Sequence, residues 1–179
     1  ATCINIEIPE LEHTLAVEFG IIPLEAGAYH LNSLQNKPGL ISPSIRTLLI
    51  AGRVIPESIY HRANTGRKLI ASALRRAFED NNLNAVITPS LPATAAKKDQ
   101  DEFTFDTLSE HISVSYVRTT APFNVSGQPA ISVPCGFDSM GLPIGLQIAT
   151  RPFDETGALR IAHAYATSTD WQLVTPKIG

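Results

Sequence analysis

The feature that most constrains the fold of this chain is a long amphipathic segment between Pro56 and Asn81. At the helical angle of about 100° per residue its apolar and small residues share one arc, which consists of Ile59, Ala63, Gly66, Ile70, Ala73, Leu74 and Ala77. A stripe of this width predicts one helix that buries a face against another layer of structure. The opposite face is rich in basic residues, and we interpret it as a solvated surface rather than a binding patch. Arg67 lies at the margin of the arc, where a snorkelling or internally paired arginine is favoured.

Short apolar runs follow this helix along the chain. Residues 84–88, 130–137 and 143–150 are rich in aliphatic side chains, and the turn-forming residues 138–141 separate the last two runs. These runs predict a buried strand followed by a β-hairpin. Long helices that alternate with short strands predict an α/β fold built in layers.

The N-terminal third carries weaker patterns. Residues 3–8 alternate between apolar and polar, which predicts a half-buried strand. A helix is expected after Pro9, and its apolar positions are Leu11, Leu15, Phe19 and Ile22. Pro23 should kink or divide that helix before residues 25–34 resume it.

Three further segments complete the prediction. Residues 43–52 and the segment from Asp154 to Thr167 predict helices, and the Asp154 side chain suits the N-cap of the second. Residues 108–116 fit either a helix or a strand, and the polar residues 95–103 predict an exposed excursion.

Composition excludes several classes of protein. Fourteen Lys and Arg against seventeen Asp and Glu give a formal net charge of −3, which lacks the basic excess of a nucleic-acid-binding protein. The charged fraction is 17% and the mean hydropathy is +0.05, so the chain should fold around a sizeable core rather than stay disordered.

No pattern indicates secretion, a membrane span or a metal site. The first 36 residues contain no Lys or Arg and five Glu, the reverse of a secretory signal, and no apolar run approaches the roughly 18 residues of a membrane span. A cytoplasmic location is therefore expected. Cys3 and Cys135 are interpreted as buried small hydrophobes, and the five histidines show no paired spacing of metal ligands.

The generic catalytic motifs are absent, since the chain contains no G-x-S-x-G, S-x-x-K, H-E-x-x-H, Walker or G-x-G-x-x-G pattern.

One segment is far more informative. From Arg118 to Arg151 the chain reads RTTAPFNVSGQPAISVPCGFDSMGLPIGLQIATR. This segment closely resembles the C-terminal signature of the amidase signature family, P-x-N-x-x-G-x-P-A-x-S-x-P-C-G-F followed by G-L-P-x-G-L-Q-I. The helix from Tyr60 to Ala77 and the strand ending in Thr88-Pro89 are also similar to that family.

The resemblance implies the C-terminal part of the amidase signature fold, a layered α/β/α architecture with a mixed sheet. It also implies that residues 1–179 are a single unit that is incomplete without an N-terminal half. Members of the family cleave amides with a serine nucleophile, a second serine and a lysine, which lie in an upstream lysine segment and a G-G-S-S-G-G stretch. This chain contains no G-G or S-S dipeptide, so no catalytic residue is assigned here, and no metal or organic cofactor is implied.

Four residues are candidates for substrate binding. Pro122, Gly127 and Pro129 predict a non-regular loop at the end of the sheet. Within it Asn124 can bind substrate or stabilise the loop, and Phe123 can line a pocket or join the core.

The other two candidates, Val117 and Arg118, precede that loop. Glutamine-directed members of the family place an acid where this chain has Val117, which favours a less polar amide, or an acidic group that Arg118 would meet. Arg118 can equally form a structural salt bridge.

The resemblance therefore implies the C-terminal region of an amidase, a C–N hydrolase acting on carboxylic amides, that contributes half of the sheet and part of the substrate pocket. The expected partners are a small-molecule amide and the missing N-terminal half or a second copy, with no nucleic acid or membrane. The alternative is a non-catalytic binding or interaction module on the same scaffold.

Overall fold

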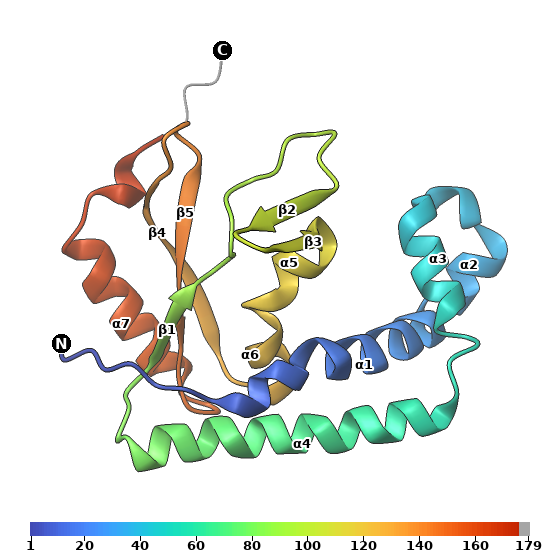
Figure 1. The fold of residues 1–179 in the computed structure, drawn as a ribbon, viewed down its shortest axis with the longest axis horizontal. Helices are drawn as coiled ribbons and strands as arrows, with labels where there is room; N and C mark the ends of the chain where they lie inside the picture. The colour runs from blue at the N-terminus through green and yellow to red at the C-terminus, as the bar shows by residue number, and fades with distance from the viewer. Residues whose placement is uncertain (176–179) are drawn as a thin grey trace.

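The computed structural model describes residues 1–175, and it packs helices against a small central sheet (Figure 1). The α-helices are α1 (Thr14–Tyr29), α2 (Leu31–Asn36), α3 (Pro43–Ala51), α4 (Glu57–Asp80), α5 (Ile112–Arg118), α6 (Ala121–Ser126) and α7 (Glu155–Thr167). The strands are β1 (Val86–Pro89), β2 (Glu102–Phe105), β3 (Leu108–His111), β4 (Ala130–Phe137) and β5 (Pro143–Ala149). Short 3₁₀ helices span Pro9–His13, Pro38–Leu40 and Trp171–Leu173.

The long helix and the hairpin are confirmed. Helix α4 runs for 24 residues and buries the predicted arc through Ala63, Ile70, Ala73 and Leu74. Arg67 pairs internally, because its Nε donates to the Val125 carbonyl oxygen at 2.8 Å. The Asp154 carboxylate accepts from the Gly157 N–H at 3.0 Å, so the predicted cap of α7 is present as well.

The central sheet has the order β1-β5-β4, and β5 pairs antiparallel with both neighbours. A second sheet consists of the antiparallel pair β2-β3. The α/β class is confirmed, while every strand pair among residues 1–175 is antiparallel. The parallel pairs of a mixed sheet are therefore not formed within this part of the chain.

Successive residues of β5 point to opposite faces of the sheet, and this alternation creates two cores. Ile148 packs with Val133 and with Ala162 of α7. Ala149 packs on the other side, in the cluster formed by α1, α4 and α6. The sheet is thus covered by α7 on one face and by the α1–α4–α6 layer on the other (Figure 1), which is the predicted α/β/α layering.

The buried face predicted for the first helix is wrong, and the helix is longer than one that ends at Pro23. Helix α1 continues through Pro23 and ends at Tyr29, so the proline does not divide it. The buried face is Thr14, Val17, Glu18, Gly20, Ile21, Pro23 and Gly27, whereas Phe19 and Ile22 are 39% and 42% exposed. The small residues allow close packing: a Cβ on Gly20 would lie 2.7 Å from Ala63 Cβ, and one on Gly66 would lie 2.6 Å from Val17 Cγ2.

The predicted N-terminal strand is also wrong, since residues 1–8 form no regular secondary structure. A strand requires a neighbour for its N–H and C=O groups, and none of the described strands pairs with these residues. The ambiguous segment 108–116 contains both alternatives, because β3 ends at His111 and α5 begins at the next residue.

The predicted loop around Asn124 is instead the short helix α6. Pro122 occupies its first turn, where a missing N–H costs nothing, and Gly127 ends it with a left-handed φ of 76°. The residues whose type predicts a loop therefore begin and end a helix.

Candidate functional site

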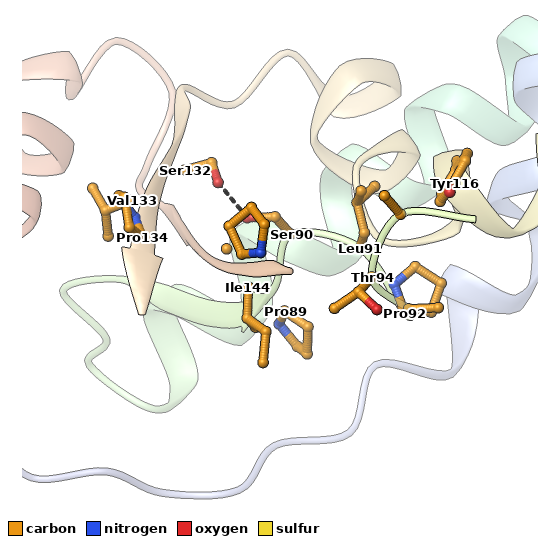
Figure 2. Close-up of a pocket in the computed structure, with 14 residues that line it drawn as sticks. Pro89, Ser90, Leu91, Pro92, Thr94, Tyr116, Ser132, Val133, Pro134 and Ile144 are labelled. Atoms are coloured by element: carbon orange, nitrogen blue, oxygen red, sulfur yellow. Dashed lines mark hydrogen bonds between the residues drawn. The ribbon is translucent and has the colours of Figure 1, made fainter. Parts of the chain in front are cut away.

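The main candidate site lies where the chain leaves β1. Ser90 follows the strand, and its N–H donates to the Gly145 carbonyl oxygen at 2.8 Å. Beyond Ser90 the chain leaves the sheet, and residues 91–95 form a loop that contains Pro92, whose nitrogen cannot donate a hydrogen bond. That loop borders the site (Figure 2).

Two serines meet across the central strand at this point. Ser90 follows β1 and Ser132 belongs to β4, and their Oγ atoms are 2.5 Å apart (Figure 2). Gly145 of β5 lies between them, and a Cβ there would lie 2.7 Å from Ser90 Oγ and 2.8 Å from Ser132 Oγ. The glycine therefore makes room for a hydroxyl pair that bridges the two outer strands.

A cavity of about 770 Å³ opens beside this pair. Its lining is mostly proline and aliphatic, and comprises Pro89, Ser90, Leu91, Pro92, Ala93, Thr94, Ala95, Tyr116, Ser132, Val133, Pro134, Pro143, Ile144 and Gly145. The volume lies in the range of small-molecule sites. Its polar side-chain groups are hydroxyls, so the cavity suits an apolar ligand with a few hydrogen-bonding atoms.

Hydrogen bonds fix two of those hydroxyls. Tyr116 Oη accepts from the Ala96 N–H at 2.7 Å, which leaves its own proton for another acceptor. Thr94 Oγ1 donates to Asp138 Oδ2 at 2.7 Å. The bond from Thr94, and then the N–H of Leu142, lower the pKa of the Asp138 carboxyl, so the anion is stabilised in the β4–β5 turn.

Val117 and Arg118 lie on α5, and neither belongs to the lining of the large cavity. The Arg118 guanidinium forms an ion pair with Glu110, and its Nε donates to Glu110 Oε2 at 3.2 Å. Ser115 Oγ donates to the same oxygen at 2.7 Å. The salt-bridge alternative for Arg118 is therefore present in the structure.

Phe123 and Asn124 are adjacent in sequence, but one side chain of α6 is buried and the other is exposed. Phe123 is 3% exposed and belongs to the core cluster with Ile70 and Leu74, as its core alternative predicts. Asn124 is exposed and lines a second, smaller cavity of about 220 Å³. This cavity is bounded by Glu18, Ile21, Ile22, Glu25, Arg67, Asn124 and Val125.

Glu18 is the unusual member of the small cavity. Its residue is 4% exposed, and Oε2 is buried without a hydrogen-bond partner among the described residues. Burial raises the pKa of this carboxyl, because the charged form loses its hydration.

Sequence reasoning does not single out Ser90, Ser132, Gly145 or Glu18. Ser132 and Gly145 belong to the motif that carries the family resemblance, but their contact requires the strand order β1-β5-β4. Glu18 has a weak signal, since it interrupts an otherwise apolar helix between Val17 and Phe19.

Across residues 1–175 no three His, Cys, Asp or Glu side chains gather closely enough to hold a metal ion. No helix in the same range is long and apolar enough to cross a membrane.

The fold of this chain recurs in a solved amidase and in a second hydrolase. The chain superimposes on a crystal structure of an amidase with a TM-score of 0.83 and 23% identity, over 91% of this chain and 37% of that one. It also matches 6-aminohexanoate cyclic dimer hydrolase, with a TM-score of 0.78 and 20% identity over 97% and 39% of the two chains. These likenesses show the α/β fold of amidase signature enzymes.

The sequence comparison then identifies the family. The family described as Amidase matches residues 1–159, and the chain therefore belongs to the amidase signature family. An amidase of Pseudomonas putida is 32% identical over 179 residues, which cover 99% of this chain and 38% of that protein. One subunit of the glutamyl-tRNA(Gln) amidotransferase of Thermodesulfovibrio yellowstonii is 41% identical over 120 residues, or 67% of this chain and 23% of that protein. The chain thus spans less than half the length of the relatives it matches.

Proposed function

We propose that this chain is the C-terminal region of an amidase, a hydrolase of the C–N bond of carboxylic amides. It contributes strands β1, β4 and β5 and one wall of the substrate pocket. The catalytic serine comes from the part of the family fold that this chain does not contain. Residues 1–179 then form one unit, which is completed by that half or by a second copy of the chain.

One observation carries this proposal. The large cavity is lined by residues of the family's own signature segment, namely Ser132–Pro134 and Pro143–Gly145, together with the loop that follows Pro89. A signature that forms the wall of a ligand-sized cavity is expected of a substrate pocket. The chain also matches 38% of the length of an amidase, which agrees with a contribution of one part of the enzyme.

The chemistry divides between the two parts. The serine of the other half attacks the amide carbonyl while a base of that half takes its proton, and backbone N–H groups hold the resulting oxyanion. The C–N bond then breaks, the amine leaves with that proton, and water hydrolyses the acyl-enzyme to release the acid and the free serine. The residues of this chain bind and orient the amide. The apolar lining of the large cavity favours a less polar amide.

The four candidate residues take different parts in this proposal. Asn124 lies outside the large cavity and reaches the substrate from the lining of the small one, and Phe123 supports it from the core. Val117 occupies the position at which glutamine-directed members of the family carry an acid, so this chain has no carboxylate there. Arg118 binds an acidic group only after exchanging its ion pair with Glu110.

Activity of the two forms tests the proposal. The longer polypeptide that carries this chain should hydrolyse simple aryl or aliphatic amides, and a serine-directed inhibitor should abolish the turnover. The 179-residue chain alone should not exceed the uncatalysed control. Inhibitor-sensitive turnover by the chain alone would contradict the assignment of the nucleophile to the other half.

A second candidate is a non-catalytic binding module on the amidase scaffold. It is favoured by the lining of the large cavity, which holds hydroxyls but no carboxylate, histidine or lysine that could act as their base. The gene sequence upstream of Ala1 distinguishes the two. A G-G-S-S-G-G stretch there supports the amidase, and its absence from the gene and its neighbours supports the binding module.

A further inference from the structure

Helix α1 buries two polar side chains, Thr14 and Glu18, on its packed face. Glu18 Oε2 and Thr14 Oγ1 are buried without hydrogen-bond partners among the described residues. The two residues are one helical turn apart and therefore share a face. Burial of Oε2 without a donor disfavours the ionised form of the Glu18 carboxyl, and an N–H donor that enters from the cavity would stabilise that form.

The small cavity has the charge to attract a cation. Glu18 and Glu25 bring two carboxyl groups to its lining, whereas Arg67 brings one guanidinium. Arg67 is anchored through Nε to the Val125 carbonyl oxygen, and Glu25 accepts from the Tyr60 hydroxyl at 2.8 Å. With both carboxyls ionised, the cavity therefore has a net negative charge.

The cavity also has room and apolar walls for a short organic group. Its volume is about 220 Å³, several times the roughly 30 Å³ that one water occupies in the liquid. Ile21, Ile22 and Val125 provide aliphatic surface beside the carboxyl groups. Asn124 adds an amide oxygen that can accept from an N–H donor.

We propose that the small cavity between α1, α4 and α6 is a binding site for a primary alkylammonium group, with the Glu18 carboxylate as its principal acceptor. A primary ammonium has three N–H donors, enough for the Glu18 carboxylate and a neighbouring oxygen at once. The methylene next to the nitrogen packs on the isoleucine surface. This site does not rest on the proposed amide hydrolysis.

Titration of the 179-residue chain with ethylammonium tests the proposal directly. Tetramethylammonium is the matched control, because it carries the same charge but no N–H donor. Ethylammonium should produce saturable NMR shifts of the backbone amides of Ile21, Asn124 and Val125, and tetramethylammonium should not.

Substitutions locate the acceptor. Glu18→Gln keeps the shape of the side chain and should weaken ethylammonium binding at least about tenfold, because a neutral amide replaces the charged acceptor. Glu7→Gln removes the same charge from an exposed position and should leave the affinity unchanged. Equal shifts with both cations, no saturation, or unchanged affinity in Glu18→Gln would each overturn the proposal. If Glu18→Gln fails to fold, the comparison of the two cations on the wild-type chain still tests the proposal.

The ammonium group can belong to the amide substrate or to a separate small molecule. The longer polypeptide distinguishes these sources, since ethylammonium should compete with the substrate in the first case and bind without competition in the second. An inactive polypeptide that still binds ethylammonium would refute the proposed function and support this site. An active one that does not bind it would do the reverse.

Discussion

The packing of α3 on α1 provides the sharpest test of the structure. Gly52 follows α3, and a Cβ at this position would lie 1.7 Å from the Pro23 carbonyl oxygen, 2.3 Å from its carbonyl carbon and 2.9 Å from the Leu24 nitrogen. All three atoms belong to the backbone of α1, so no side-chain rotation can relieve the overlap. A Gly52→Ala substitution must push the two helices apart.

The expected cost exceeds that of ordinary overpacking. Extra methylenes in a packed core cost about 1–3 kcal/mol. At Gly52 the added Cβ would meet backbone atoms, which cannot move aside as a side chain can. The two helices also approach closely at Gly27, where a Cβ would lie 2.7 Å from the Leu49 carbonyl oxygen. We expect Gly52→Ala to lower the free energy of unfolding by at least about 3 kcal/mol, which corresponds to a fall of roughly 6–12 °C in Tm for a chain of this size.

Gly39→Ala is the matched control for this experiment. A Cβ on Gly39 meets no atom within 4 Å, so the substitution should be neutral or stabilise by up to about 1 kcal/mol through the unfolded state. Chemical denaturation of the wild type and both variants measures the difference. If Gly52→Ala unfolds within about 0.5 kcal/mol of Gly39→Ala, a threshold well below the overpacking cost, the close approach of α3 to Pro23 is refuted.

The remaining predictions concern the site, the titration and the surface. Gly145→Ala should break the contact between Ser90 and Ser132, because its Cβ would lie within 2.8 Å of both hydroxyls. Those hydroxyls can rotate away, so a loss of about 1–2 kcal/mol is expected by denaturation, and an unchanged stability would show that the bridge contributes nothing. Burial raises the pKa of Glu18, so the native state binds its proton more tightly than the unfolded state. Stability should therefore fall as the pH rises through and above the ordinary carboxyl range; Glu18→Gln should flatten that fall in a series of unfolding curves, and identical profiles would contradict it. Asn124→Ala should reduce amide turnover by the longer polypeptide while changing stability by less than about 1 kcal/mol, whereas equal losses of both would assign it to the fold alone. Apolar side chains such as Tyr29, Leu40 and Val54 are 85%, 83% and 77% exposed, so light scattering of the isolated chain should report association, and a monodisperse 19.3 kDa particle would argue against a missing partner surface.

A local sequence pattern is sufficient to predict the secondary structure where one periodicity dominates. The arc from Ile59 to Ala77 predicts α4, and the turn at 138–141 predicts the hairpin of β4 and β5. The quoted segment from Arg118 to Arg151 is enough to indicate the amidase signature family. In each case neighbours in sequence determine the structure, so the information is present in a short window.

Two local predictions fail because a neighbour in space decides them. The alternation of residues 3–8 predicts a strand, but none of the described strands pairs with it. On α1 the apolar stripe through Phe19 and Ile22 predicts the wrong buried face. Packing instead selects the face with Gly20, since only a residue without a Cβ fits against Ala63.

The sequence by itself determined the helices and hairpin that local periodicity encodes, and it determined the family through an ordered motif. Only the tertiary structure decided which residues form cavities. Ser90 and Ser132 are 42 positions apart and meet because β5 pairs with both β1 and β4. Glu18 and Asn124 line one cavity because α1 and α6 both pack on α4. Such contacts depend on strand order and helix packing over long sequence separations, which no local spacing of residues specifies.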